Sequence, residues 1–133
     1  MPRPDFLADA TLQTVLATLP DARVVGGCVR DSLLGLPIAD IDIACPLPPD
    51  RIISVLRAAG LHPLPTGLAH GTVTARVGDP RFEITSLRRD LQTDGRRATV
   101  AFIDDWREDA ARRDFTINAM SLSPIGTLYD YFG

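Results

Sequence analysis

The fold is decided by residues 40–44, Asp40-Ile41-Asp42-Ile43-Ala44, in which polar and apolar side chains alternate. Alternation with a period of two is typical of a β-strand that has one buried face and one polar face. Both aspartates then lie on the polar face, roughly 6.6 Å apart along the strand. Two carboxylates this close repel each other unless a cation lies between them. The stretch therefore predicts a strand that can hold a hard divalent ion such as Mg²⁺.

A plainer explanation of the same pattern stays open. An edge strand can carry a solvated polar face, and aspartates on such a face have no function of their own. If metal does bind, Asp40 and Asp42 can bridge the two ions that phosphoryl-transfer sites hold about 3.5–4 Å apart. The residues around the strand favour the metal site.

Upstream of the strand, a second candidate site is formed by a glycine pair. Residues 23–25 predict a short strand, Gly26-Gly27 ends it, and residues 28–34 predict a helix. Glycines at a helix start let an anion approach the open backbone N–H groups, and the helix dipole favours negative charge there. Arg30 lies one turn inside the helix and can bind the same anion, such as a triphosphate. A tight turn with an Arg30–Asp31 surface pair also explains these residues.

Downstream, residues 71–77 and 81–87 predict the two strands of an antiparallel hairpin. Glu83 lies on the polar face of the second strand. If this strand neighbours the strand of Asp42, Glu83 is a third carboxylate, which can ligate a metal or accept the proton of an attacking hydroxyl. A surface ion pair with a nearby arginine is the alternative.

Near the end of the chain, Arg112-Arg113-Asp114 follow a helix predicted to begin with Asp104 as its cap. Arginines at a helix end complement the helix dipole, which is the plain explanation. Arginine forks also bind phosphates, and Asp114 and Asn118 can hydrogen-bond ribose hydroxyls. Residue types alone do not choose between the two.

The remaining segments predict scaffold. Helices are expected over residues 8–19 and 48–60, a strand over 98–103 and a hairpin over 116–131, whereas residues 88–97 predict a basic loop. This order of elements predicts the α/β (α+β) class, with one mixed β-sheet and helices packed on it.

Composition limits the function further. The chain has 133 residues, the size of one domain, and a net charge of −3, which argues against a general basic coat for nucleic acid. All 14 cationic residues are arginine, so lysine Schiff-base chemistry and a P-loop lysine are excluded. No apolar stretch approaches the length of a membrane span and no signal-peptide pattern follows Met1, so a cytoplasmic protein without membrane contact is expected.

Three strings of the chain resemble the head domain of class II tRNA nucleotidyltransferases and bacterial poly(A) polymerases, in the family's order. The strings are Gly26-Gly27-Cys28-Val29-Arg30-Asp31, Asp40-Ile41-Asp42-Ile43-Ala44 and Arg112-Arg113-Asp114-Phe115-Thr116-Ile117-Asn118-Ala119-Met120. Between them, Glu83-Ile84-Thr85-Ser86-Leu87-Arg88 is similar to the family's Glu-Val-Thr-Thr-Phe-Arg. Together these strings run through nearly the whole chain from residue 24 onward.

The resemblance implies a polymerase-β-like nucleotidyltransferase fold. It also implies that Asp40 and Asp42 hold two Mg²⁺ ions and that Glu83 is a third acid of the catalytic group. The residues that it implies for the triphosphate, the other nucleotide phosphates and the ribose are Gly26, Gly27, Arg30, Arg112, Arg113, Asp114 and Asn118.

The implied reaction is attack of an RNA 3′-hydroxyl on the α-phosphate of ATP or CTP, with release of pyrophosphate. CCA addition to tRNA is the first expectation. The alternatives are poly(A) synthesis, a nucleotide-binding module without independent catalysis, and transfer to an acceptor other than RNA. Family members continue into neck, body and tail domains that select the base and bind much of the RNA. Residues 1–133 are therefore expected to be the head domain alone.

Overall fold

The computed structural model describes residues 10–26, 29, 41–67, 71–76, 81–91, 99–112 and 120–131. The helices are α1 (Ala10–Thr18), α3 (Pro49–Ala58) and α4 (Trp106–Ala111). The strands are β1 (Arg23–Val25), β2 (Asp42–Cys45), β3 (His62–Gly67), β4 (Thr72–Arg76), β5 (Arg81–Ser86), β6 (Arg88–Leu91), β7 (Thr99–Phe102), β8 (Ser121–Leu122) and β9 (Leu128–Tyr129).

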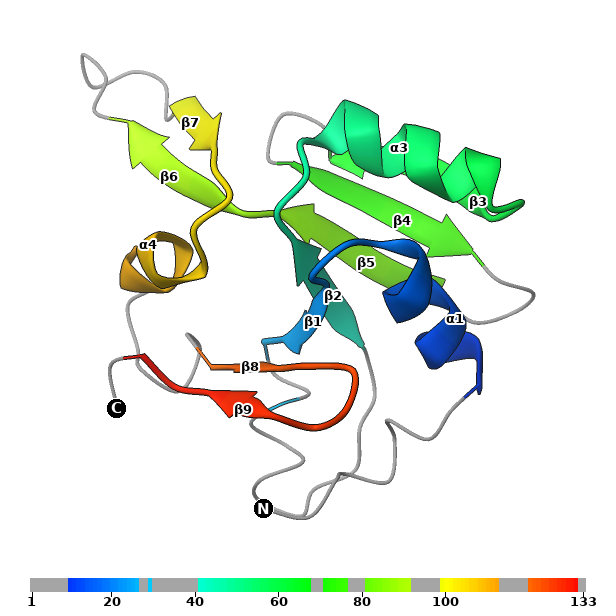
Figure 1. The fold of residues 1–133 in the computed structure, drawn as a ribbon. Helices are drawn as coiled ribbons and strands as arrows, with labels where there is room; N and C mark the ends of the chain where they lie inside the picture. The colour runs from blue at the N-terminus through cyan, green and yellow to red at the C-terminus, as the bar shows by residue number, and fades with distance from the viewer. Residues whose placement is uncertain are drawn as a thin grey trace.

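Seven of these strands form one mixed sheet within the described residues, in the order β3-β4-β5-β2-β1-β8-β9, and β6 pairs with β7 in a separate hairpin. Figure 1 shows α1 and α3 packed on the large sheet and the β6–β7 hairpin projecting away from it. The expected class, a mixed sheet with helices packed on it, is confirmed.

Strand β2 lies inside the sheet, parallel to β5 on one side and antiparallel to β1 on the other. An interior strand has both rows of backbone groups paired, so its position is fixed by two neighbours. The expectation that this strand could lie at the edge of the sheet is therefore wrong. The polar residue that β2 presents, Asp42, lies between two other strands.

The main core lies on the sheet face that α1 and α3 cover. Leu12, Val15 and Leu16 on α1 and Ile52 and Leu56 on α3 are at most 2% exposed. They pack in one cluster with fully buried residues of the central strands, namely Val24, Ile43, Val73, Ile84 and Leu122. Burial of each such side chain contributes about 1.5–3 kcal/mol, so this face fixes the register of the sheet.

The opposite face carries the polar residues of the same strands. Directly opposed residues share a face, and the register joins Thr74 to Glu83, Glu83 to Asp42, Asp42 to Val25, and Val25 to Ser121. Part of this face is closed by a second, smaller core in which Trp106 of α4 packs with Val25, Ala44 and Leu87.

Two expectations need correction, and one strand was missed. Residues 88–91 of the predicted basic loop form strand β6, which pairs with β7. The cap of α4 is Asp105, not Asp104, because Asp105 Oδ1 accepts hydrogen bonds from the backbone N–H groups of Arg107 (2.9 Å) and Glu108 (3.1 Å). Strand β3 was not predicted at all, although it forms one edge of the large sheet.

The hairpins on either side of the site were predicted correctly. Strands β4 and β5 are antiparallel, and β8 and β9 meet at a turn in which Gly126 N–H donates to Ser123 O (2.9 Å). None of the helices in the described ranges combines the length and the apolar character that crossing a bilayer demands.

Candidate active site

The centre of the site is a pair of carboxylates on adjacent parallel strands. Asp42 on β2 and Glu83 on β5 are register partners, and neighbouring strands lie about 4.8 Å apart. Their side chains therefore leave the sheet on the same face, where Asp42 is half-buried and Glu83 is exposed. The condition set for Glu83, that its strand neighbours the strand of Asp42, is met.

The glycine that follows β1 lies against Asp42, one member of this pair. Gly26 has a φ of +75°, in the left-handed region that favours glycine. A Cβ at Gly26 would lie 3.2 Å from Asp42 Oδ2 and would crowd it. A side chain at this position would therefore have to push the Asp42 carboxylate aside by a few tenths of an ångström.

The backbone turns directly after Gly26. Its carbonyl accepts a hydrogen bond from the N–H of Val29 (3.2 Å), which is a helical residue. Gly26 is thus linked both to a helical residue three positions later and, by close approach, to Asp42. This places the first residue of the glycine pair and the carboxylates at one place on the sheet.

The donor set fits a hard divalent cation. Carboxylate oxygens are the ligands that Mg²⁺ prefers, and two of them face the same side of neighbouring strands here. In the described part of the chain no group of three or more histidine, cysteine, aspartate or glutamate side chains is placed to hold a metal ion. The expected additional ligand, Asp40, lies outside the described residues.

Arg112 ends α4 and is anchored by an acid of the same helix. Its Nε donates to Oδ1 of Asp109 at 3.2 Å, and Asp109 is 3% exposed. The same Oδ1 accepts the backbone N–H of Arg88, the first residue of β6, at 2.9 Å. One buried carboxylate therefore joins the first arginine of the Arg112-Arg113-Asp114 motif to the strand that follows β5.

The structure brings Gly26, Asp42 and Glu83 together and links Arg112 to β6. Six further residues of the predicted site lie outside the described residues, and their roles stay predictions: Gly27, Arg30, Asp40, Arg113, Asp114 and Asn118.

Two features of this region were missed by sequence reasoning. Asp109 was visible only as one of several acids in a short helix, and its contacts join segments 21 residues apart. Arg23 is 7% exposed, although the sequence predicted residues 23–25 only as a short strand and gave this arginine no role. Its guanidinium carbon lies 4.2 Å from the ring centre of Trp106 and 3.7 Å from that of Tyr129. No local pattern pairs residues so distant in sequence.

Cys45, at the far end of β2, takes no part in this group. Burial raises the pKa of its thiol to about 11, opposed by a backbone hydrogen bond with Leu47 and assisted by the charge of Asp21. A neutral, buried thiol is a poor nucleophile and a poor metal ligand.

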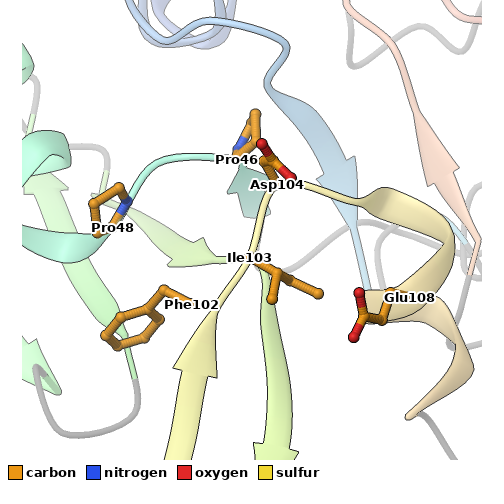
Figure 2. Close-up of a pocket in the computed structure, with 6 residues that line it drawn as sticks. All are labelled: Pro46, Pro48, Phe102, Ile103, Asp104 and Glu108. Carbon is orange, nitrogen blue, oxygen red and sulfur yellow. The ribbon is translucent and has the colours of Figure 1, made fainter.

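An open hollow of about 450 Å³ lies at the same far end of β2. It is lined by Pro46, Pro48, Phe102, Ile103, Asp104 and Glu108, which Figure 2 shows around the connection between β7 and α4. None of the predicted site residues that the structure describes lines it. Asp42 begins β2 and Pro46 follows its last residue, so the hollow and the carboxylate pair lie at opposite ends of that strand.

Comparison with known proteins gives one consistent family. Residues 22–133 match the family described as "Poly A polymerase head domain". The chain is 48% identical over 113 residues to human CCA tRNA nucleotidyltransferase 1, mitochondrial, covering 84% of this chain and 26% of that protein. It is 39% identical over 131 residues to the CCA-adding enzyme of Oceanobacillus iheyensis, covering 97% of this chain and 32% of that enzyme.

Solved structures agree. The CCA-adding enzyme of Bacillus stearothermophilus in complex with CTP matches with a TM-score of 0.78 at 35% identity, over 100% of this chain and 31% of that one. A tRNA nucleotidyltransferase complexed with a primer tRNA and an incoming ATP analog matches with a TM-score of 0.63 at 34% identity, over 85% of this chain and 32% of that one. The chain thus spans about a quarter to a third of the length of these relatives.

Proposed function

Because the chain belongs to the poly A polymerase head domain family, we propose that it is the catalytic head of a metal-dependent nucleotidyltransferase acting on RNA 3′ ends. The observation that carries the proposal is the placement of Gly26 against Asp42 beside the register partner Glu83. Three segments that are distant in sequence meet there, and each contributes the residue type that nucleotidyl transfer needs.

The proposed metal is Mg²⁺, with two ions. Asp42 and Asp40 would hold them, and Glu83 is the third acid. When bound, such ions neutralise the charge of a triphosphate and polarise its α-phosphate. The facing carboxylates support this proposal, because an unneutralised pair on adjacent strands is electrostatically unfavourable.

The chain's own residues have distinct tasks in the proposed reaction. The glycine turn after β1 lets the triphosphate approach the backbone, and Arg30, Arg112 and Arg113 bind its phosphates through their guanidinium groups. Asp114 and Asn118 accept or donate hydrogen bonds to the ribose.

The bond changes of the proposed reaction are simple. The RNA 3′-oxygen forms a bond to the α-phosphorus, the bond to the bridging oxygen breaks, and pyrophosphate leaves with that electron pair. The hydroxyl proton passes to a carboxylate, for which Glu83 is the proposed acceptor because it is exposed beside Asp42. Positioning and charge neutralisation then supply most of the rate enhancement.

We assign CCA addition to tRNA as the reaction, with ATP and CTP as the nucleotides. The names of the relatives favour this assignment over poly(A) synthesis. Two similar structures, one in complex with CTP and one with a primer tRNA and an ATP analog, support the same partners.

Incorporation of labelled CMP and AMP tests the assignment. The protein is incubated with a tRNA that lacks its 3′ CCA and, in parallel, with an unrelated RNA ending in a free 3′-hydroxyl, with and without Mg²⁺. The proposal expects Mg²⁺-dependent incorporation of both nucleotides into the tRNA. A long run of AMP on either RNA would replace CCA addition by poly(A) synthesis, and binding of both nucleotides without incorporation would reduce the domain to a nucleotide-binding module.

A further inference from the structure

We propose that Asp109 is a positioning residue that sets the guanidinium of Arg112 for the nucleotide. The inference rests on the proposed function, since it names a further residue of the same site. Asp109 itself is not proposed to touch substrate. It acts through Arg112, and its contact with the first residue of β6 holds the carboxylate in place.

The contacts of Asp109 define its task. Its carboxylate is 3% exposed, and such a buried charge is costly unless it is paired. Oδ1 accepts from Arg112 Nε at 3.2 Å and from the backbone N–H of Arg88 at 2.9 Å. A charge-assisted contact to Nε restricts where the guanidinium can lie.

The contact leaves Arg112 suited to bind an anion. A guanidinium has five N–H donors in a planar fork, and Asp109 engages the one on Nε. The side chain of Arg112 is 16% exposed, so the guanidinium is partly buried but still accessible to a ligand. Bidentate phosphate recognition needs a fork held in this way.

Asp109 also connects α4 to the strand that follows β5. Arg88 follows Glu83 by five residues, with Ser86 ending β5 and Leu87 packed in the small core beneath Trp106. The hydrogen bond to Arg88 N–H therefore ties the end of α4 to the chain that carries Glu83.

The other end of α4 is also held. Trp106 Nε1 donates to Oδ2 of Asp21 at 3.0 Å, and its ring lies 4.2 Å from the Arg23 guanidinium carbon. A six-residue helix has little stability of its own, so these contacts at its two ends determine where it lies. Of the residues of α4 that make these contacts, Asp109 is the one that contacts Arg112 directly.

The test compares nucleotide affinity with stability in the whole protein. The dissociation constants of ATP and CTP with Mg²⁺ and the melting temperature are measured for wild type, Asp109→Asn and the matched control Glu108→Gln. The control removes the same negative charge from the residue that precedes Asp109 in the same helix. Asp109→Asn is expected to weaken the affinity for each nucleotide about 10-fold. This is the lower end of the loss that follows when the group orienting a metal ligand is removed, which is a comparable positioning role. Glu108→Gln is expected to leave both affinities unchanged.

The double variant separates positioning from simple support. If Asp109 acts through Arg112, adding Asp109→Asn to Arg112→Ala changes affinity by less than about twofold. A melting temperature that falls in Asp109→Asn while both affinities stay at wild-type values would overturn the inference. So would a full additional loss on the Arg112→Ala background.

If Asp109→Asn does not fold, a second variant still tests the inference. Arg112→Lys keeps the charge but removes the Nε donor, so the inference expects weaker nucleotide binding, and an unchanged affinity contradicts it. Wild-type protein that binds neither nucleotide would instead overturn the proposed function. The two failures are therefore distinguishable.

Discussion

Gly26 and Asp42 are complementary: the carboxylate of one occupies the space that a side chain on the other would need. The distance from a Cβ at Gly26 to Asp42 Oδ2 would be 3.2 Å, and Gly26 has a φ of +75°. Two motifs 16 residues apart in sequence thus depend on each other sterically. This dependence makes the glycine part of the site rather than of the turn alone.

Replacing Gly26 with alanine should therefore lower both stability and nucleotidyl transfer. The left-handed backbone costs an alanine roughly 1–2 kcal/mol, and displacement of Asp42 is expected to reduce transfer about 10- to 100-fold. Gly60→Ala is the matched control, because Gly60 has a φ of +78° and a Cβ there would meet nothing within 4 Å. Equal losses of transfer in the two variants would argue against the contact with Asp42.

Glu83→Gln tests the third acid. The amide keeps the size of the side chain but cannot accept the hydroxyl proton, so transfer is expected to fall about 100-fold or more at unchanged stability. Single-turnover incorporation of AMP and circular dichroism together measure both quantities. Since Glu83 is exposed at the surface of β5, an inactive but unfolded variant is not expected. Wild-type transfer by Glu83→Gln would remove this residue from the catalytic group.

The sequence predicted much of this fold and only part of its detail. Periodic helices and alternating strands were found because one buried face imposes a period on the residues. Strand β3 was missed because it contains Pro63 and Pro65, which lack an N–H, and an edge strand tolerates them. The arginine-rich start of β6 shows no alternation of polar and apolar residues. Its strand structure comes from its pairing with β7, which the local sequence does not encode.

The site was predictable to a similar degree. Residue type and spacing sufficed for Asp42 and Glu83, because alternation fixes the face on which each side chain lies. The cluster around Arg23 and the anchor Asp109 depend on contacts between segments far apart in the chain, which no local pattern encodes.

The buried arginine of β1 should contribute measurably to stability. Arg23 lies between the rings of Trp106 and Tyr129 and donates to the hydroxyl of Tyr131 at 2.9 Å. We expect Arg23→Met to lower the free energy of unfolding by about 2 kcal/mol. Urea unfolding followed by the fluorescence of Trp106, the sole tryptophan of the chain, measures this directly.

The exposed Arg51 of α3 supplies the control for that variant. Arg51→Met is expected to change stability by less than about 0.5 kcal/mol, as is usual at the surface. If Arg23→Met proved as stable as Arg51→Met, the two ring contacts would contribute nothing net.

The raised pKa of Cys45 makes the free energy of unfolding depend on pH. Burial holds its pKa near 11 in the folded chain, against 9.0 for an ordinary thiol, so the unfolded chain loses this proton first as the pH rises. The contribution is complete below pH 9 and is lost as the pH approaches about 11, by about 1.4 kcal/mol per pH unit. Urea unfolding at several pH values should show this slope in wild type and a smaller one in Cys45→Ala. Identical slopes would contradict the burial effect.

We claim that the sheet face around Asp42 is a metal-dependent nucleotide site. The most direct test is a calorimetric titration of wild type and Asp42→Asn with ATP and with CTP, each with and without Mg²⁺. We predict that wild type binds both nucleotides only with Mg²⁺ and that Asp42→Asn, though folded, loses this binding. Nucleotide binding that is indifferent to Mg²⁺ and to the substitution, or no binding by folded wild type under any condition, would contradict the claim.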